Sequence, residues 1–510
     1  MIYNKLYDWQ KQVINENKDK KSYGLFLDCG LGKTPISLAF AEENNCEKVL
    51  IITINPKAVE DINDKGSWYD WLSQSKMNYI IKNKTSKVFE KDHSEALVIN
   101  YESLFKRANK SSHQKTELKD NIVEFVKTCK GKNVAIIIDE SHKVKNLQSL
   151  QTCAIFKIQT LLNNISNNLF IYLLSGTPFT TGYIDLYSQL KLLGCKMNKS
   201  EYVDNYCIRG NLPGLLGWQQ PIVGYKNVES LYKLVHKYAI TMKTESVIKL
   251  PEQIFVEYVL PNSLDFRMFT NETYNGESIY NYAFSRSIFL DKNEFKVDKK
   301  INNPFYANID YPNERWIGDT SGNFWLRARQ LSIGFQGNKE ESKWFDRKRL
   351  EKLKLFLETN EDNYILFYNY TPELLELYEI CDKLGYNIDV YCGEIKSLAF
   401  YERYSHQSEE QKLTNKKNII LANWSSGSTG LNLQEYNKCI LFSIPLYSEY
   451  EQGIKRINRI GQKQTCIYYM FYQNNWLDKG MLKALQEGID YSNDLFKSQL
   501  KNNQGENNEN

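Results

Sequence analysis

The chain has 510 residues, of which 42% are hydrophobic and 25% are charged, and its formal net charge is +4. This hydrophobic share is enough for packed cores, and the length predicts about three domains. The small net charge excludes a protein that is basic over its whole surface, so any nucleic-acid track must be a local stripe. The ten scattered cysteines form no Cys-x-x-Cys pair, which indicates reduced thiols in a cytosolic compartment and no zinc site. We find no N-terminal signal and no apolar run long enough to cross a bilayer, and we expect a cytoplasmic protein without a membrane partner.

The first strong pattern joins a short apolar run to a helix through glycines. Residues 23–28 are typical of a buried strand, and residues 34–43 carry apolar side chains at helical spacing. Backbone N–H groups between them, with the positive end of the helix, can surround phosphate oxygens, while a lysine adds a point charge and a threonine binds Mg²⁺. We expect this loop to bind ATP through Gly30, Gly32, Lys33 and Thr34. Near the start of the chain, Gln10 offers an amide that both donates and accepts, and it can therefore read the adenine edge.

A second apolar strand ends in two carboxylates. Residues 134–139 form a continuous apolar run that leads into Asp139 and Glu140. Phosphate transfer needs a further Mg²⁺ ligand and a group that orients the attacking water. Asp139 suits the metal and Glu140 suits the water. A third strand, residues 170–175, runs into the tight turn of residues 176–178, whose hydroxyl groups can sense the nucleotide state.

Near the C-terminus a glutamine and two arginines follow one another closely. Gln452, Arg456 and Arg459 lie in residues 452–462, which the pattern predicts to be one helix. Arg456 and Arg459 are three positions apart, so on a helix they share one face. A nucleotide in the phosphate loop needs cationic groups that stabilise the charge leaving its γ-phosphate. We therefore expect all three residues to take part in catalysis with the two carboxylates.

The ordered motifs resemble those of superfamily 2 helicases, and specifically the Swi/Snf-type branch of DNA-dependent ATPases in a compact form of the bacterial or phage type. Four passages carry this narrower resemblance: residues 28–34, 139–142, 425–434 and 456–462. Residues 224–227, followed by Leu250-Pro251, are similar to the linker into the second lobe of that branch. Together the similar passages span residues 6 to 462.

The chain departs from the branch at two places. The branch usually has adjacent arginines shortly before the Leu-Pro pair, whereas residues 239–243 read Ala-Ile-Thr-Met-Lys and leave Lys243 as the nearest cation. Residues 27–29 read Leu-Asp-Cys where the branch carries Asp-Glu-Met, so one carboxylate is missing just ahead of the glycines. The phosphate ligands themselves are intact.

Alternating strands and helices predict an α/β protein, and the resemblance implies two RecA-like, doubly wound parallel-sheet lobes with helical insertions between them. Strands of the first lobe are expected near residues 49–53, 96–100, 134–139 and 170–175. Strands of the second are expected at residues 364–369, 387–391, 418–422, 438–443 and 466–471. We place the first lobe at residues 1–193, the helical protrusions and linker at 194–354, the second lobe at 355–500 and a disordered tail at 501–510.

The resemblance implies an ATP-dependent motor that translocates on double-stranded DNA and remodels DNA structures or protein–DNA complexes. Two alternatives stay open: a strand-separating DNA helicase, which would need a wedge that splits the duplex, and a nucleotide-gated DNA-binding scaffold without motor activity. The expected cofactors are ATP and Mg²⁺, and the expected partner is duplex or branched DNA. By the same resemblance, polar groups in loops that follow the strands contact the DNA backbone. These residues are Lys57, Tyr101, Asn369, Ser428 and Thr429.

Overall fold

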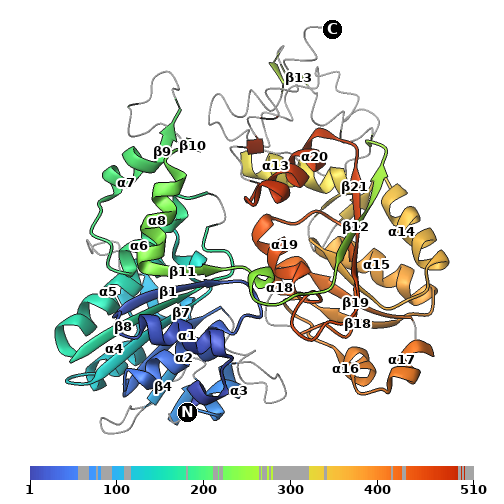
Figure 1. Cartoon of the computed structure of the whole chain (residues 1–510). Coiled ribbons are helices and arrows are strands. Elements are labelled where there is room, and N and C mark those ends of the chain that lie inside the picture. Colours follow the sequence, from blue (N-terminus) through green and yellow to red (C-terminus); the bar gives the residue numbers. More distant parts are fainter. Residues whose placement is uncertain are drawn as a thin grey trace. The chain divides into compact units, whose positions relative to one another are not determined.

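The structure is a computed structural model whose described residues form two compact units, residues 1–249 (unit 1) and 250–510 (unit 2) (Figure 1). It describes residues 1–54, 68–75, 78–81, 95–107, 116–179, 182–210, 216, 222–263, 266, 273–274, 277–278, 321–337, 342–414, 417–427, 432–491, 495–496 and 499. The predicted DNA contacts Lys57, Ser428 and Thr429 and the predicted tail at residues 501–510 lie outside this set. The expected domain boundaries after residues 193 and 354 stay predictions.

Unit 1 is built on a seven-stranded sheet of order β11-β1-β8-β7-β2-β4-β3, in which every neighbouring pair runs parallel. Its strands are β1 (Ser22–Leu27), β2 (Lys48–Thr53), β3 (Asn78–Ile81), β4 (Glu95–Asn100), β7 (Asn133–Asp139), β8 (Asn168–Leu174) and β11 (Ala239–Met242). The predicted strands are therefore confirmed to within two residues at each end. Strands buried on both faces read as continuous apolar runs, and this makes them visible in sequence.

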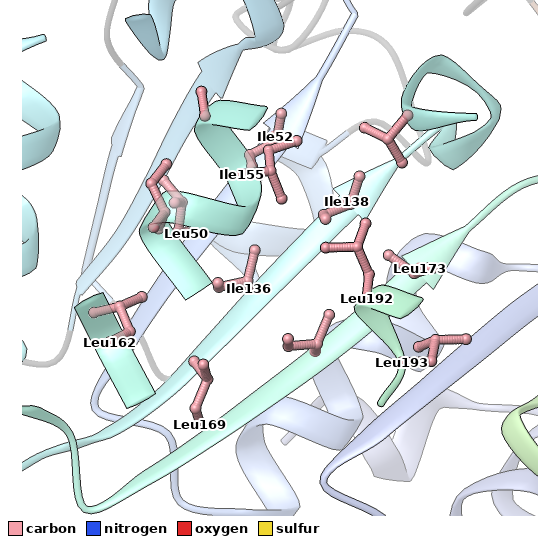
Figure 2. Close-up of a cluster of buried hydrophobic side chains, with 14 of the residues drawn as sticks. Leu50, Ile52, Ile136, Ile138, Ile155, Leu162, Leu169, Leu173, Leu192 and Leu193 are labelled. Carbon is pink, nitrogen blue, oxygen red and sulfur yellow. The ribbon is translucent and has the colours of Figure 1, made fainter. Parts of the chain in front are cut away.

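Helices cover both faces of this sheet. Side chains of α1 (Asp8–Asn17), α2 (Lys33–Glu43) and α3 (Trp68–Ser73) join the core on one face. The opposite core takes side chains from α4 (Asp120–Thr128), α5 (Leu150–Ile165), α6 (Asp185–Leu192), α7 (Lys199–Tyr206) and α8 (Val228–Tyr238). Figure 2 shows Ile136 and Ile138 of β7 in this second core together with Ile155 and Leu162 of α5. Ile137 belongs to the other core, because successive strand side chains point to opposite faces.

Shorter elements complete unit 1. Four 3-10 turns are described: η1 (Ile2–Lys5), η3 (Tyr101–Ser103), η4 (Ser141–Val144) and η6 (Thr244–Ser246). Two antiparallel pairs stand outside the main sheet: β5 (Phe105–Arg107) with β6 (Thr116–Leu118), and β9 (Cys207–Arg209) with β10 (Ile222–Tyr225). The turns η3, η4 and η6 matter for function because they adjoin the predicted nucleotide site.

Unit 2 contains a six-stranded parallel sheet of order β12-β21-β20-β17-β19-β18. Its strands are β12 (Gln253–Leu260), β17 (Tyr364–Tyr368), β18 (Asn387–Tyr391), β19 (Asn418–Asn423), β20 (Lys438–Leu441) and β21 (Cys466–Gln473). Two small antiparallel pairs are also described: β13 (Thr273–Tyr274) with β14 (Glu277–Ser278), and β15 (Phe335–Gly337) with β16 (Ser342–Trp344). Both units are therefore mixed α/β with doubly wound parallel sheets, as the sequence predicts.

The helices of unit 2 also flank their sheet. Side chains of α14 (Lys348–Thr359) and α15 (Thr371–Lys383) fill the core on one face. The other face is covered by α16 (Ala399–Ser405), α18 (Trp424–Gly427) and α19 (Tyr447–Ile454). A further cluster joins α13 (Ser321–Ile333) to α20 (Trp476–Glu487), and α17 (Glu409–Thr414) follows α16 in the chain.

Two strands lie in the region where the sequence showed few parallel-strand signals. Within residues 194–354, β11 adds to the sheet of unit 1 and β12 adds to the sheet of unit 2. Both occupy sheet edges, and β12 keeps several side chains exposed. Strand β11 has only four residues, and Glu257 interrupts the apolar run of β12, so neither stands out in the sequence as a buried central strand.

Candidate active site

The loop between β1 and α2 has the shape of an anion cradle. Gly30 (φ 86°) and Gly32 (φ 76°) both adopt the left-handed conformation that favours glycine. A Cβ at Gly32 would lie 2.4 Å from the Gln10 side-chain nitrogen, so a larger residue would displace that buried side chain. The helix that starts at Lys33 has no side-chain cap, and its first N–H groups have no partner within the helix. A phosphate group therefore fits this helix end, with Thr34 as the second helical residue.

Lys33 folds back along the loop that it belongs to. Its Nζ donates to the backbone carbonyls of Leu27, at 2.8 Å, and of Asp28, at 3.1 Å. These contacts hold the ammonium group beside the loop. A phosphate could replace the two carbonyls as the partner of this ammonium, which is the role expected of Lys33.

Gln10 supports the same loop from α1. Its Oε1 accepts the backbone N–H of Tyr7 at 3.0 Å, and its Nε2 donates to the carbonyl of Leu31 at 3.0 Å. The side chain is buried and thus joins the start of α1 to the phosphate loop. Recognition of adenine by Gln10 stays a prediction.

Asp139 ends β7 with both carboxylate oxygens hydrogen-bonded. Oδ2 accepts from the Trp68 indole at 2.9 Å and from the Thr53 hydroxyl at 3.1 Å, and Oδ1 accepts the backbone N–H of Glu140 at 3.0 Å. Desolvation raises the pKa of the Asp139 carboxyl above its ordinary value, and the neighbouring charge of Glu140 raises it further. The Trp68 hydrogen bond, the Lys33 ammonium and the Thr53 hydrogen bond oppose that rise in pKa. A bound cation would favour the ionised carboxylate, as expected of a metal ligand.

Glu140 has an unusual backbone, and its side chain contacts His142 of the same acidic motif, residues 139–142. Its dihedral angles (φ 51°, ψ 54°) lie in the left-handed region, which costs a non-glycine residue about 1–3 kcal/mol. Its Oε2 lies 3.2 Å from Nδ1 of His142, and that nitrogen lies 3.4 Å from the Ser175 hydroxyl. Ser175 in turn accepts the N–H of Thr177 at 3.1 Å. The acidic motif is therefore in contact with the turn that follows β8.

Gln189 forms a second bridge between these two motifs. The Ser141 hydroxyl donates to Gln189 Oε1 at 2.7 Å, and Gln189 Nε2 donates to the carbonyl of Pro178. Ser141 and Gln189 are completely buried. Gln189 thus joins the acidic motif to the turn at residues 176–178 by hydrogen bonds to both.

Tyr101 lies beneath the acidic motif. Its hydroxyl donates to the carbonyl of Asp139 at 2.6 Å, and its side chain is only 2% exposed. Tyr101 therefore supports the backbone of Asp139 through this hydrogen bond. Its proposed contact with the DNA backbone stays a prediction.

Sequence reasoning missed three residues that position this site. Thr53 ends a predicted strand, and its place at the carboxyl edge of the sheet was a usable signal. Trp68 and Gln189 gave no local signal, because each acts on a motif far away in the sequence.

The residues assembled in unit 1 fit a nucleotide with Mg²⁺. β1 and β7 both pair with β8, so their carboxyl ends meet at one edge of the parallel sheet, where ligands of such sheets bind. Within the described part of the chain, that edge brings together Lys33, the uncapped N-terminus of α2 and the carboxylates of Asp139 and Glu140. Among the described residues, the buried hydroxyl of Thr177 has no hydrogen-bond partner, and it follows β8 at the same edge. The expected metal ligands Thr34 and Asp139 each follow or end one of these strands.

The predicted helix over residues 452–462 is wrong. Helix α19 ends at Ile454, and Arg456 and Arg459 lie in the turns that follow. A continued helix would need the carbonyls of Arg456 and Ile457, but these accept from the N–H of Leu433, at 3.2 Å, and from the side chain of Gln462, at 3.3 Å. The Arg456 carbonyl thus has a partner distant in the sequence, while the Ile457 carbonyl has a local partner that is not helical.

Two of the predicted motor motifs meet within unit 2. The side-chain nitrogen of Gln462 donates to the carbonyls of Gln434 and Tyr436, each at 3.0 Å. Gln452 is buried, and Arg456 is 8% exposed. Residues 432–434 of the passage 425–434 therefore contact the passage 456–462. The catalytic roles of Gln452, Arg456 and Arg459 stay predictions.

Asn369 lies at the carboxyl edge of the second sheet. Its side-chain nitrogen donates to the Ser443 hydroxyl at 2.9 Å and to the carbonyl of Ile444 at 3.0 Å, and its own carbonyl accepts from Asn423 at 2.9 Å. Asn369 therefore ties together the chain after β17, β20 and β19. Its predicted contact with DNA is not tested by these bonds.

A comparison with known families finds a similarity within unit 1. Residues 4–180 match the family model described as type III restriction enzyme, res subunit, a superfamily 2 helicase-like ATPase domain. This range contains the phosphate loop, the acidic motif and the turn after β8. A search of curated proteins finds no match to the chain. No helix in the described residues is long and apolar enough to span a membrane.

Proposed function

We propose that the chain is an ATP-dependent motor that moves on double-stranded DNA and remodels DNA structures or protein–DNA complexes. The observation that carries the ATPase part is the assembly of Lys33, Asp139 and Glu140 at one sheet edge, next to the linked turn after β8. The family match of residues 4–180 supports an enzyme of the helicase-like ATPase type. The Swi/Snf-type resemblance of the motifs supports duplex or branched DNA as the track.

In this proposal each of these residues of unit 1 has a separate role in ATP binding or hydrolysis. Lys33 and the N–H groups at the start of α2 hold the phosphates of ATP, and Thr34 and Asp139 hold Mg²⁺. A bound Mg²⁺ supplies positive charge next to the phosphate oxygens. Glu140 orients the attacking water and accepts its proton. Gln10 hydrogen-bonds to the adenine edge and also supports the phosphate loop through the carbonyl of Leu31.

The proposal gives unit 2 the groups that complete hydrolysis. Arg456 and Arg459 supply the cations that stabilise charge developing on the γ-phosphate, and Gln452 helps to position the reacting groups. Loops at the carboxyl edges of both sheets, including Asn369, grip DNA through phosphate and sugar, so we expect little sequence preference.

The test is the rate of ATP hydrolysis without nucleic acid and with single-stranded DNA, duplex DNA, forked DNA or RNA. We expect duplex DNA to stimulate at least as well as single strands, and added salt to reduce stimulation because phosphate contacts release counterions. The Lys33→Ala variant is the control for contaminating ATPase. Stronger stimulation by RNA than by any DNA would contradict the proposed track.

Translocation is separated from the alternatives in a second assay. Displacement of a third strand from a DNA triplex, without unwinding of a forked duplex, supports a translocase. Efficient unwinding of the fork would instead favour the strand-separating helicase. Nucleotide binding with no hydrolysis on any nucleic acid would favour the nucleotide-gated scaffold.

A further inference from the structure

Asp28, the residue just ahead of the phosphate loop, holds the segment that leads out of unit 1. Its Oδ2 accepts the backbone N–H of Thr244 at 2.9 Å and the Thr244 hydroxyl at 3.3 Å. Both residues are buried. The contact joins positions 216 residues apart, so it is a tertiary hydrogen bond and not one within a local turn.

The backbone of Asp28 takes part in two further contacts. Its N–H donates to the carbonyl of Met242 at 3.1 Å, which extends the pairing of β1 with β11. Its carbonyl accepts from Lys33 Nζ at 3.1 Å. Asp28 therefore touches the phosphate-binding lysine through its backbone and the segment after β11 through its side chain.

Thr244 fixes the turn that follows it. The N–H groups of Val247 and Ile248 both donate to the carbonyl of Thr244, at 3.0 and 2.9 Å. This turn, η6, leads to Lys249, where unit 1 ends and the chain enters unit 2. These two hydrogen bonds join Thr244 to the end of the segment 244–248.

We propose that Asp28 is a positioning residue that couples nucleotide binding in the phosphate loop to the segment 243–249, which connects the two units. The inference rests on the proposed binding of ATP at Lys33. A phosphate that orders the loop and takes over the Lys33 ammonium changes the hydrogen bonds at the carbonyls of Leu27 and Asp28. Because Asp28 also holds Thr244, the ordered loop stabilises the turn at residues 244–248.

The amide of Thr244 reports this coupling directly, since it donates to Asp28. We would measure hydrogen–deuterium exchange of the segment 243–249 with and without a non-hydrolysable ATP analogue and Mg²⁺. Coupling free energies between sites typically change an equilibrium about 5- to 150-fold, so we expect exchange of this segment to slow about 5-fold or more on binding. Affinity for a fluorescent ATP analogue is measured in parallel.

Asp28→Ala removes the carboxylate that accepts from Thr244. We expect this variant to bind nucleotide still. The segment 243–249 should exchange fast, and nucleotide should no longer slow that exchange. Asp28→Asn keeps one oxygen acceptor, so it should restore part of the response, and it serves as the test if the alanine variant does not fold. A matched control is Asp389→Ala in unit 2. Asp389 is a buried carboxylate that likewise accepts backbone N–H groups, from Phe400 and Tyr401, and a serine hydroxyl.

The outcomes separate this inference from the proposed function. If the wild-type protein binds nucleotide but exchange of residues 243–249 does not change, the coupling is overturned and the ATPase proposal stands. The same holds if Asp28→Ala responds to nucleotide as the wild type does. If the wild-type protein binds no nucleotide, the proposed function fails. The coupling then fails too, because it depends on nucleotide binding.

Discussion

The indole nitrogen of Trp68 lies 2.9 Å from the Oδ2 atom of Asp139 and donates a hydrogen bond to it. Trp68 lies on α3 and Asp139 ends β7, so a helix that packs on the sheet orients the predicted metal ligand. Outer partners of this kind fix the direction of a carboxylate, and their loss typically weakens metal affinity or activity about 10- to 100-fold.

Trp68→Phe should therefore raise the Mg²⁺ concentration that gives half-maximal ATPase by about 10-fold or more, because the ring is kept and only the donor is lost. A Mg²⁺ titration of the steady-state rate is the measurement. Trp71→Phe, on the same helix, is the control and should leave the titration unchanged. An unaltered Mg²⁺ dependence in Trp68→Phe would show that the indole does not orient Asp139.

Lys33→Ala and Glu140→Gln should fail in different ways. Lys33 meets charge that is already present on bound ATP, so its loss should weaken nucleotide binding by about 10-fold or more, as for a hydrogen bond to a charged group. Glu140 acts mainly in the transition state, so its amide variant should bind ATP and lose about 10²- to 10⁴-fold in turnover. Fluorescent nucleotide titration and steady-state ATPase distinguish the two. Near-normal hydrolysis by Glu140→Gln would refute its role as base.

Arg456→Ala and, separately, Arg459→Ala should keep nucleotide and DNA binding and lose most DNA-stimulated hydrolysis. Arginines that stabilise developing charge are worth about 10³ to 10⁵ in turnover in other phosphate-transfer enzymes. Lys455→Ala is the neighbouring control, since its ammonium pairs with Glu451 at 2.8 Å. The measurement is the ATPase rate of each variant at saturating DNA. If both arginine variants are fully active, neither arginine takes part in catalysis.

Arg349 should be essential for the stability of unit 2. Its side chain is 1% exposed, pairs with Asp478 at 3.2 Å and donates to the carbonyl of Phe442 at 2.8 Å. Breaking one partner of a buried pair typically costs about 3–5 kcal/mol, so we expect this loss of unfolding free energy in Arg349→Met.

Arg347→Met provides the comparison for the buried pair. Arg347 pairs with Glu376 through a side chain that is 51% exposed, so its loss should cost only about 0–1 kcal/mol. Urea unfolding of the full chain measures both variants. Equal losses for the two arginines would contradict a special role of the buried pair.

Glu373 should make the stability of unit 2 depend on pH. Burial raises the pKa of its carboxyl from 4.5 to about 7, while hydrogen bonds from Ser443 and from the backbone of Asn369 and Tyr370 only partly oppose the rise. Because the pKa is higher in the folded state, the stabilising contribution is complete below pH 4.5 and is lost as the pH rises through about 7. The shift corresponds to about 3 kcal/mol.

Glu373→Gln should remove this contribution, so its unfolding free energy should fall less between pH 4.5 and 7 than that of the wild type. Urea unfolding at a series of pH values is the measurement. Glu379→Gln is an exposed control on the same helix. If the wild type and Glu373→Gln have the same pH dependence, Glu373 does not titrate in this range.

The sequence by itself determined most strands of the two sheets and the motifs at their carboxyl ends. Central parallel strands are buried on both faces, so residues such as those at 134–139 form apolar runs that can be recognised locally. The phosphate loop is equally local, because left-handed glycines and a helix start are properties of a short stretch of chain. Lys33, Asp139 and Glu140 could be placed on these grounds alone.

Only the tertiary structure decided which side chains support those motifs and where helix α19 ends. The partners of Asp139, Gln189 and Thr244 are distant in the sequence, and hydrogen bonds of this kind leave no periodic pattern. Beyond the end of helix α19 at Ile454, the carbonyl of Arg456 accepts from the N–H of Leu433, a partner distant in the sequence that local propensity does not include. Edge strands β3, β11 and β12 were not predicted, since β3 and β11 have four residues each and Glu257 interrupts the apolar run of β12.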